Sequence, residues 1–159
     1  IDSLICLVKR SILSMKGEEQ MTNSEKFQAF KESVVRKHEE LYGAEARQEY
    51  GDEEIDAAQQ KILNMSEEEY ERFQSLGNEI KERLKEAVLS GISPESDEAG
   101  RIVTLHKEWL GMTWKKYTEE AHKAIANMYI ADERFKIYYD REVSECAEFL
   151  EKAIRNKVK

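Results

Sequence analysis

One stretch of this chain, residues 106–135, reads HKEWLGMTWKKYTEEAHKAIANMYIADERF. It holds both tryptophans, two of the three histidines, two of the five methionines and two tyrosines within a charge-rich helical pattern. Aromatic and thioether side chains give a large contact area with a few polar tips, which suits a pocket for a bulky, mostly apolar organic ligand. Any one of these residues is also compatible with the core of a helical domain. The clustering, not a single residue, favours a ligand site.

The composition around this stretch predicts an all-α protein. The chain of 159 residues has one proline, seven glycines and 36% charged residues, and it lacks runs of sheet-forming residues. Its formal charge of -8 should repel nucleic acid and anionic membranes, so any DNA-binding activity is expected in another part of the protein. The apolar run at residues 4–8 is too short to span a bilayer, and we expect a soluble, cytoplasmic protein with no membrane partner.

Apolar residues at intervals of three or four predict six to eight helices joined by short loops. The clearest start signal is Ser66 with Glu69, a capping box that opens a long helix, and Gly91 is predicted to close it. Thr118 is predicted to cap a later helix, and the last helix is expected from about Glu142.

The region before Ser66 is thinly apolar and acidic. Gly43 is predicted to end the first helix of this region, which leaves about two turns between residues 44 and 50. We expect residues 23–64 to be the least stable part of the domain, because few hydrophobic side chains are there to anchor it.

The first residues follow a heptad pattern typical of a left-handed coiled coil. Two heptads are marginal alone, so this helix either pairs with a second chain or folds back on its own domain, and we expect pairing. Because the chain starts in the middle of this pattern without a methionine, we expect it to be a fragment. The predicted dimerisation residues are Ile1, Ile5, Val8, Ile12 and Met15.

No pattern in the chain supports catalysis or metal binding. His38 lacks the partner at i+4 that a zinc-binding helix shows, and His106 and His122 are better explained as core or pocket-lining groups than as catalytic bases. Cys6 and Cys146 match no metal or redox spacing, so reduced cytosolic thiols are expected. We therefore predict a protein that is not an enzyme and holds no cofactor and no metal.

Most acidic pairs are expected to be solvated helix surface. The triplet Asp132, Glu133 and Arg134 differs, because it lies between Tyr129 and Phe135. A two-bond contact between the Arg134 guanidinium and a carboxylate is predicted to fix this turn, which is a structural role.

Several short segments together resemble the TipAS antibiotic-recognition domain, the C-terminal ligand-sensing part of a group of MerR-type transcription activators. The resemblance covers about residues 27–154 and is strongest in the string M-Y-x-x-D-E-R-F with A-H upstream. The segments that carry it are Tyr50-Gly51-Asp52, Asn64-Met65-Ser66 with Tyr70, His106-Lys107-Glu108-Trp109, Ala121-His122, and Met128-Tyr129 through Asp132-Glu133-Arg134-Phe135.

The resemblance implies a globin-like all-helical domain that takes up large hydrophobic molecules such as thiopeptide antibiotics, in a cleft roofed by a flexible N-terminal portion. It also implies that residues 1–15 are the end of a dimerisation helix leading to a DNA-binding domain. A cysteine captures the ligand covalently in the thiopeptide-binding branch. The matching position here is Ala124, so reversible binding is expected and the ligand need not be a thiopeptide.

We therefore predict a ligand-sensing regulatory domain that binds large hydrophobic drugs or antibiotics and signals to a DNA-binding domain upstream. The alternative is a helical platform for another protein, with no small-molecule ligand. The expected partners are a hydrophobic, drug-like or thiopeptide-like molecule, a second copy of the chain through the N-terminal helix, and DNA only through the missing domain. The predicted ligand-binding residues are Trp109, Trp114, Tyr117, His122, Met128, Tyr129, Phe135, His106, Tyr139 and Phe30.

The predicted domain organisation has three parts: the end of a coiled-coil helix at residues 1–16, a linker at 17–23 and a ligand-sensing domain at 24–159. Within the last part, residues 24–64 are expected to form a flexible lid and residues 65–159 the core.

Overall fold

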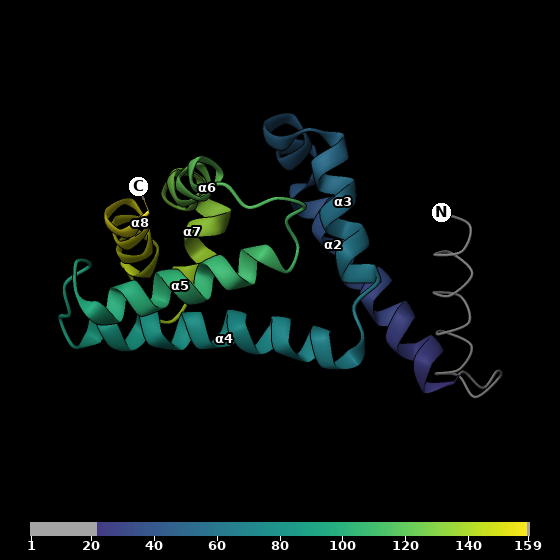
Figure 1. Ribbon diagram of the computed structural model, residues 1–159, viewed down its shortest axis with the longest axis horizontal. Coiled ribbons are helices and arrows are strands. Elements are labelled where there is room, and N and C mark those ends of the chain that lie inside the picture. Colours follow the sequence, from purple (N-terminus) through teal and green to yellow (C-terminus); the bar gives the residue numbers. More distant parts are fainter. Residues whose placement is uncertain (1–21, 159) are drawn as a thin grey trace. The chain divides into compact units, whose positions relative to one another are not determined.

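The computed structural model describes residues 22–158 and shows seven α-helices and no strand within that range (Figure 1). The predicted all-α class is confirmed. The chain divides into two compact units, of which the first ends at Tyr70 and the second begins at Glu71. The predicted dimerisation residues lie outside the described residues. The helices are α2 (Asn23–Tyr50), α3 (Asp52–Leu63), α4 (Glu67–Leu89), α5 (Asp97–Gly111), α6 (Glu119–Ala131), α7 (Glu133–Asp140) and α8 (Cys146–Lys157).

In the first unit, α2 and α3 pack side by side (Figure 1). The Thr22 hydroxyl accepts a hydrogen bond from the Glu25 backbone N–H at 3.1 Å, and the Glu25 carboxylate accepts from the Thr22 backbone N–H. This capping box satisfies two amide groups that would otherwise lack partners at the start of α2.

The prediction that Gly43 ends a helix is wrong, because α2 continues through it to Tyr50. Gly43 is buried, and a Cβ at this position would lie 1.4 Å from a carboxylate oxygen of Glu39. The Glu39 carboxylate therefore uses the space that a side chain would fill, and it accepts a hydrogen bond from Arg47 Nε at 2.9 Å, two turns further along. This pair spans the glycine and compensates for its poor helix propensity.

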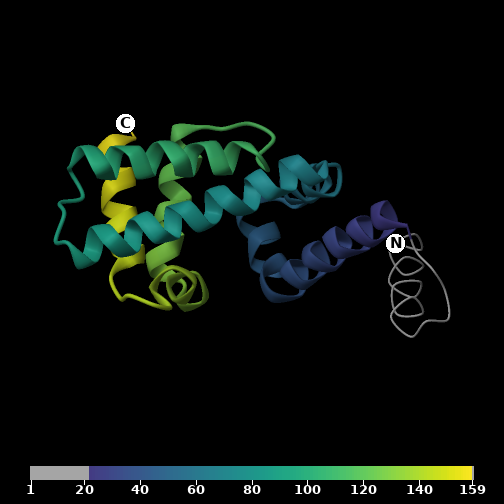
Figure 2. The same cartoon turned by 90° about the horizontal axis from the view of Figure 1, so that it is seen from below.

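The second unit holds the main hydrophobic core, to which α4, α5, α6, α7 and α8 all contribute. Figure 2 shows α6 and α8 crossing the direction of α4 and α5, and α8 contacts α5, α6 and α7. Each fully buried leucine or isoleucine contributes about 1.5–3 kcal/mol relative to an exposed one. The largest buried apolar side chains of this core include Ile80, Leu84, Ile102, Leu150 and Ile154.

Two predicted helix starts agree with the structure and one does not. The Ser66 hydroxyl accepts from the Glu69 backbone N–H, and the Thr118 hydroxyl accepts from the Ala121 backbone N–H, both at 3.1 Å. The last helix begins at Cys146 and not near Glu142. A longer-range contact fixes the start of this helix. A carboxylate oxygen of Asp140 accepts a hydrogen bond at 2.8 Å from the backbone N–H of Ala147, which lies seven residues further along the chain.

Candidate functional site

Two histidines from neighbouring helices meet in the second unit. His106 lies on α5 and His122 on α6, and His106 Nδ1 is 2.8 Å from His122 Nε2. Both side chains have 0% exposed surface, so water does not compete for this contact. Their rings are nearly parallel, with centroids 5.0 Å apart.

A tyrosine extends the pair at each end. The Tyr117 hydroxyl is 2.7 Å from His122 Nδ1, and the Tyr129 hydroxyl is 3.1 Å from His106 Nε2. All four ring nitrogens therefore have partners, as buried polar groups require. We call this continuous set, Tyr117–His122–His106–Tyr129, the Tyr-His chain.

Both histidines are held in the neutral form. Burial lowers the pKa of His106 to about 3, with a further contribution from His122, and burial lowers the pKa of His122 to about 4, with a contribution from Lys107. Geometry also prevents both histidines from being charged at once, because two N–H groups would then face each other across 2.8 Å without an acceptor. The pair therefore serves as uncharged hydrogen-bonding groups at neutral pH.

Each tryptophan contacts one member of the Tyr-His chain: Trp109 lies beside His106, and Trp114 lies beside Tyr117. Trp109 stacks on Phe73 of α4 with ring centroids 5.5 Å apart, and a Cβ placed on Gly77 would lie 3.3 Å from the Trp109 ring nitrogen. Gly77 thus gives the indole room against α4. Trp114 stacks on Tyr117 at 6.1 Å, and the Lys107 ammonium lies 4.7 Å from the centre of the Tyr117 ring. Tyr117 is consequently the half-buried end of the Tyr-His chain.

The inner end of the chain is enclosed by aromatic rings of α7. Tyr129 contacts Tyr139 at 4.8 Å and Phe135 at 6.1 Å between ring centroids. Burial raises the pKa of Tyr139, to which a hydrogen bond with Tyr129 also contributes. Met128 lies half-buried on the same helix as Tyr129, one residue before it.

The turn before α7 has the structural role that its sequence predicts. The Arg134 guanidinium donates to both carboxylate oxygens of Asp132, at 3.1 and 2.8 Å, and the same carboxylate accepts the Arg134 backbone N–H at 2.9 Å. The Arg134 guanidinium holds the pKa of the Asp132 carboxyl below its usual range. This cap fixes the start of α7, and with it the position of Phe135 and Tyr139.

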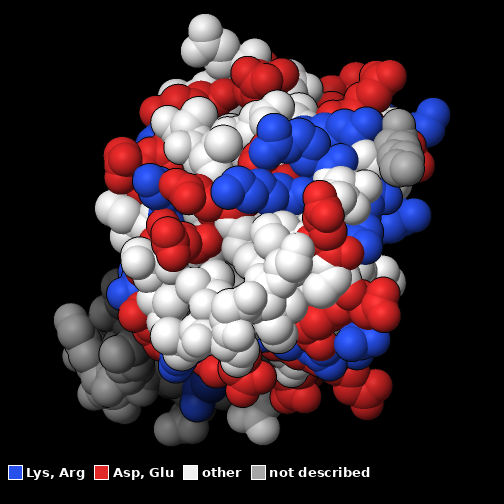
Figure 3. All heavy atoms as spheres, turned by 90° about the vertical axis from the view of Figure 1, so that its left-hand side faces the viewer, with Lys and Arg blue, Asp and Glu red and all other residues white. Residues whose placement is uncertain are grey.

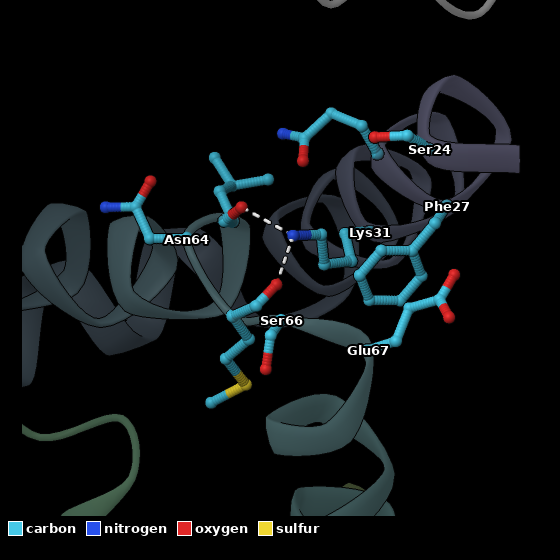
Figure 4. Close-up of a pocket in the computed structure, with 9 residues that line it drawn as sticks. Ser24, Phe27, Lys31, Asn64, Ser66 and Glu67 are labelled. Carbon is cyan, nitrogen blue, oxygen red and sulfur yellow. Dashed lines mark hydrogen bonds between the residues drawn. The ribbon is translucent and has the colours of Figure 1, made fainter. Parts of the chain in front are cut away.

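One predicted ligand-binding residue, Phe30, lies in the first unit. Its ring is 51% exposed and meets the Tyr70 ring edge-on at 5.7 Å. Beside it, α2 and the α3–α4 junction border an open hollow of about 530 Å³, with Phe27 in its wall (Figure 4). Nine of the ten predicted residues thus lie in the second unit, while Phe30 lies in the first.

Lys31 is a polar residue of this hollow that the sequence analysis missed. It is 3% exposed, and its ammonium donates to the backbone carbonyls of Leu63 and Met65, both at 2.7 Å (Figure 4). Burial lowers its pKa, while Glu32 and Glu69 oppose that shift. The ammonium therefore joins α2 to the junction between α3 and α4. The sequence did not indicate that this lysine is buried, because it lies among other charged residues of a helix.

A second hollow, of about 220 Å³, lies in the second unit between the α4–α5 turn and α8. Figure 3 views this end of the molecule, where uncharged surface is bordered by acidic and basic side chains. The hollow is lined by Val88, Gly91, Ile92, Pro94, Glu145, Glu148, Phe149 and Lys152. Neither hollow includes the aromatic residues around the Tyr-His chain.

Other site chemistries find little support among residues 22–158. No group of three or more histidine, cysteine or acidic side chains in this range could hold a metal ion. Cys146 is buried, and burial raises the pKa of its thiol to about 11, which makes it a poor nucleophile. No helix in the described part of the chain is both long enough and apolar enough to cross a bilayer.

Comparison with protein families gives one match over most of the chain. The family model described as the TipAS antibiotic-recognition domain matches residues 42–156. An HTH-type transcriptional regulator, SkgA, of Caulobacter vibrioides is 24% identical over 96% of this chain and 60% of its own length. The HTH-type transcriptional activator mta of Bacillus subtilis is 23% identical over 97% of this chain and 59% of its own length. The chain thus spans about three fifths of these curated relatives.

A solved structure shares the fold. It is TipAS from Streptomyces lividans in complex with nosiheptide, part of a thiopeptide antibiotic multidrug resistance system. The TM-score is 0.64 with 22% sequence identity, and the match covers 87% of this chain and 95% of that one. This similarity supports the predicted globin-like helical architecture.

Proposed function

Because the chain belongs to the TipAS antibiotic-recognition domain family, we propose that it is the ligand-sensing part of a MerR-type transcriptional activator. It binds large hydrophobic drugs or antibiotics reversibly, and their binding is transmitted to a DNA-binding domain elsewhere in the protein. The curated relatives, which are HTH-type regulators with additional length, support this role. The proposal involves no catalysis, no cofactor and no metal.

The observation that carries the proposal is the set of aromatic residues around the Tyr-His chain, within the family match. Trp114 and Tyr117 form its half-buried edge, whereas His106, His122 and Tyr129 are fully enclosed. A ligand reaches the enclosed groups only when neighbouring side chains move. Ligand binding is therefore expected to be coupled to a conformational change, which is what a sensor needs.

A second candidate function, a helical platform for another protein, has one observation in its favour. The aromatic residues of the second unit pack on one another, whereas Phe30 is exposed and Phe27 borders the 530 Å³ hollow. Exposed aromatic rings beside a hollow suit protein docking. In this case hydrophobic small molecules would leave the second unit unchanged.

Titration with nosiheptide, followed by tryptophan emission, tests the sensor proposal. Trp109 and Trp114 both lie close to the Tyr-His chain, so binding is expected to shift or quench their emission. A Trp114→Phe variant leaves Trp109 as the single reporter and shows whether the change extends to α5. If nosiheptide and a panel of apolar drugs all leave the emission unchanged, the platform function replaces the sensor function.

A cysteine variant tests where the ligand lies. Ala124 is exposed on α6, two residues beyond His122. In a Cys6→Ser background, Ala124→Cys is expected to gain the mass of nosiheptide, because the resemblance places the capturing cysteine at this position. The background protein keeps only Cys146, which is buried, and should gain no mass. An Ala124→Ser variant is the control that lacks the thiol.

A further inference from the structure

The Tyr-His chain has only two neutral proton arrangements that satisfy all of its ring nitrogens. A neutral imidazole carries one N–H, so one nitrogen donates while the other accepts. The contacts of 2.7, 2.8 and 3.1 Å link four groups in series, and the direction of one hydrogen bond therefore sets the direction of the others.

In the inward arrangement, Tyr117 donates to His122 Nδ1, His122 Nε2 donates to His106 Nδ1, and His106 Nε2 donates to the Tyr129 oxygen. Both rings then carry their proton on Nε2. In the outward arrangement every bond is reversed, and both rings carry their proton on Nδ1. Tyr129 also shares a hydrogen bond with Tyr139, which gives its hydroxyl a second partner.

Mixed arrangements are disfavoured. If the two rings held their protons on different nitrogens, two N–H groups or two lone pairs would face each other across the 2.8 Å contact. Both rings are fully buried, so water cannot satisfy the mismatched groups. The two histidines must therefore change tautomer together.

The two arrangements differ in what Tyr117 offers to its surroundings. In the inward arrangement the Tyr117 O–H donates to His122, and a lone pair of its oxygen can accept a hydrogen bond from a donor on the ligand. In the outward arrangement the oxygen accepts from His122, and the O–H is available to an acceptor. Tyr117 is the half-buried member of the chain and stacks on Trp114.

We propose that Tyr117 is an adaptable hydrogen-bonding contact for uncharged aromatic ligands, because His122 and His106 reverse together behind it. The site then accepts a ligand with a phenol or amide donor, or one with a carbonyl acceptor, without leaving a buried histidine nitrogen unsatisfied. This inference rests on the proposed function for the ligand, but the concerted tautomers can be tested without one.

The first experiment is two-bond ¹⁵N–¹H correlation of the histidine rings in the ligand-free chain at pH 7.5. His106 and His122 are expected to show the same tautomer, or the same average of the two tautomers. Tyr129→Phe should move both rings towards Nδ1–H, because an unpaired acceptor on His106 is tolerated better than an unpaired donor. Tyr117→Phe should move both rings towards Nε2–H for the same reason at the other end.

Tyr138→Phe is the matched control, since Tyr138 is 40% exposed and lies outside the chain. It should leave both tautomers as in the natural sequence. The proposal is overturned if the two rings differ in tautomer, or if the Tyr117 and Tyr129 variants fail to shift them in opposite directions.

The second experiment measures binding of 2-naphthol, a donor, and 2-acetonaphthone, an acceptor. The natural sequence should bind both with similar affinity. Tyr129→Phe should favour the acceptor by about tenfold, although Tyr129 is buried and lies at the opposite end of the Tyr-His chain from Tyr117. If Tyr129→Phe leaves the ratio of the two affinities unchanged, Tyr117 is not the hydrogen-bonding contact for the ligand. Failure of the sensor function is distinguishable, because nosiheptide then gives no tryptophan response while the two tautomers still shift together.

Discussion

Mild acid should destabilise this protein through His106 and His122. Both folded-state pKa values are lowered by burial, to about 3 and about 4, from an ordinary value of 6.5. Below pH 6.5 the unfolded chain therefore binds more protons than the folded chain. The stabilisation is fully present above pH 6.5 and is lost as the pH falls towards the folded-state values.

The expected size follows from linkage. Below the unfolded-state pKa, the contribution of each histidine to the free energy of unfolding falls by about 1.4 kcal/mol per pH unit. At pH 5 the loss is therefore about 2 kcal/mol for each histidine and about 4 kcal/mol for the pair. Carboxylates contribute little in this window, because their unfolded pKa values lie near 4. A loss of this size is a large part of the stability of a domain.

Urea unfolding at pH 7.5 and pH 5.0, followed by far-UV circular dichroism, measures this loss. A His38→Gln background isolates the pair, since desolvation also lowers the pKa of His38 and it would act in the same direction. The ring proton shifts of His106 and His122 in the folded chain should not titrate between pH 7.5 and 5.0. Equal unfolding free energies at the two pH values, or a ring that titrates near pH 6.5, would refute the reasoning.

Three further changes should destabilise particular elements. Ser66→Ala removes the N-cap of α4 and should cost about 1 kcal/mol in urea unfolding, whereas Ser66→Asp should retain most of the stability. Lys31→Met leaves the carbonyls of Leu63 and Met65 without their donor and should cost about 2 kcal/mol, seen as faster amide exchange in α2 and α3; unchanged exchange would contradict this role. Asp132→Ala removes the cap of α7 and should cost about 1 kcal/mol, whereas Asp132→Asn should lose less.

Local signals predicted much of the fold, because they act within a few residues. The caps at Ser66 and Thr118 lie where the sequence places them, and the Arg134 guanidinium bonds to the Asp132 carboxylate as predicted. The predictions of a helix end at Gly43 and of the start of α8 were wrong because contacts between more distant residues determine both. Arg47 bridges to Glu39 across the glycine, and Asp140 caps a helix that begins six residues later. Neither contact follows from local propensity.

The candidate site was predictable as a set of residues and not as an arrangement. The clustering of aromatic residues and histidines between positions 106 and 135 indicated which side chains meet. The order Tyr117–His122–His106–Tyr129 depends on how α5 and α6 pack and on the rotamers of both rings. Phe73, which stacks on Trp109, comes from α4 and lies 36 positions away in the sequence, so the clustering gave no sign of it.

The continuity of α2 across Gly43 has a mechanical consequence. At 1.5 Å per residue, its 28 residues form a rod about 42 Å long. A tilt of about 10° around the end near Tyr50 would carry the Thr22 end through about 7 Å. Two shorter helices broken at the glycine would absorb such a tilt in a joint. An unbroken α2 can instead act as a lever that enlarges a small rearrangement at one end into a large displacement at the other.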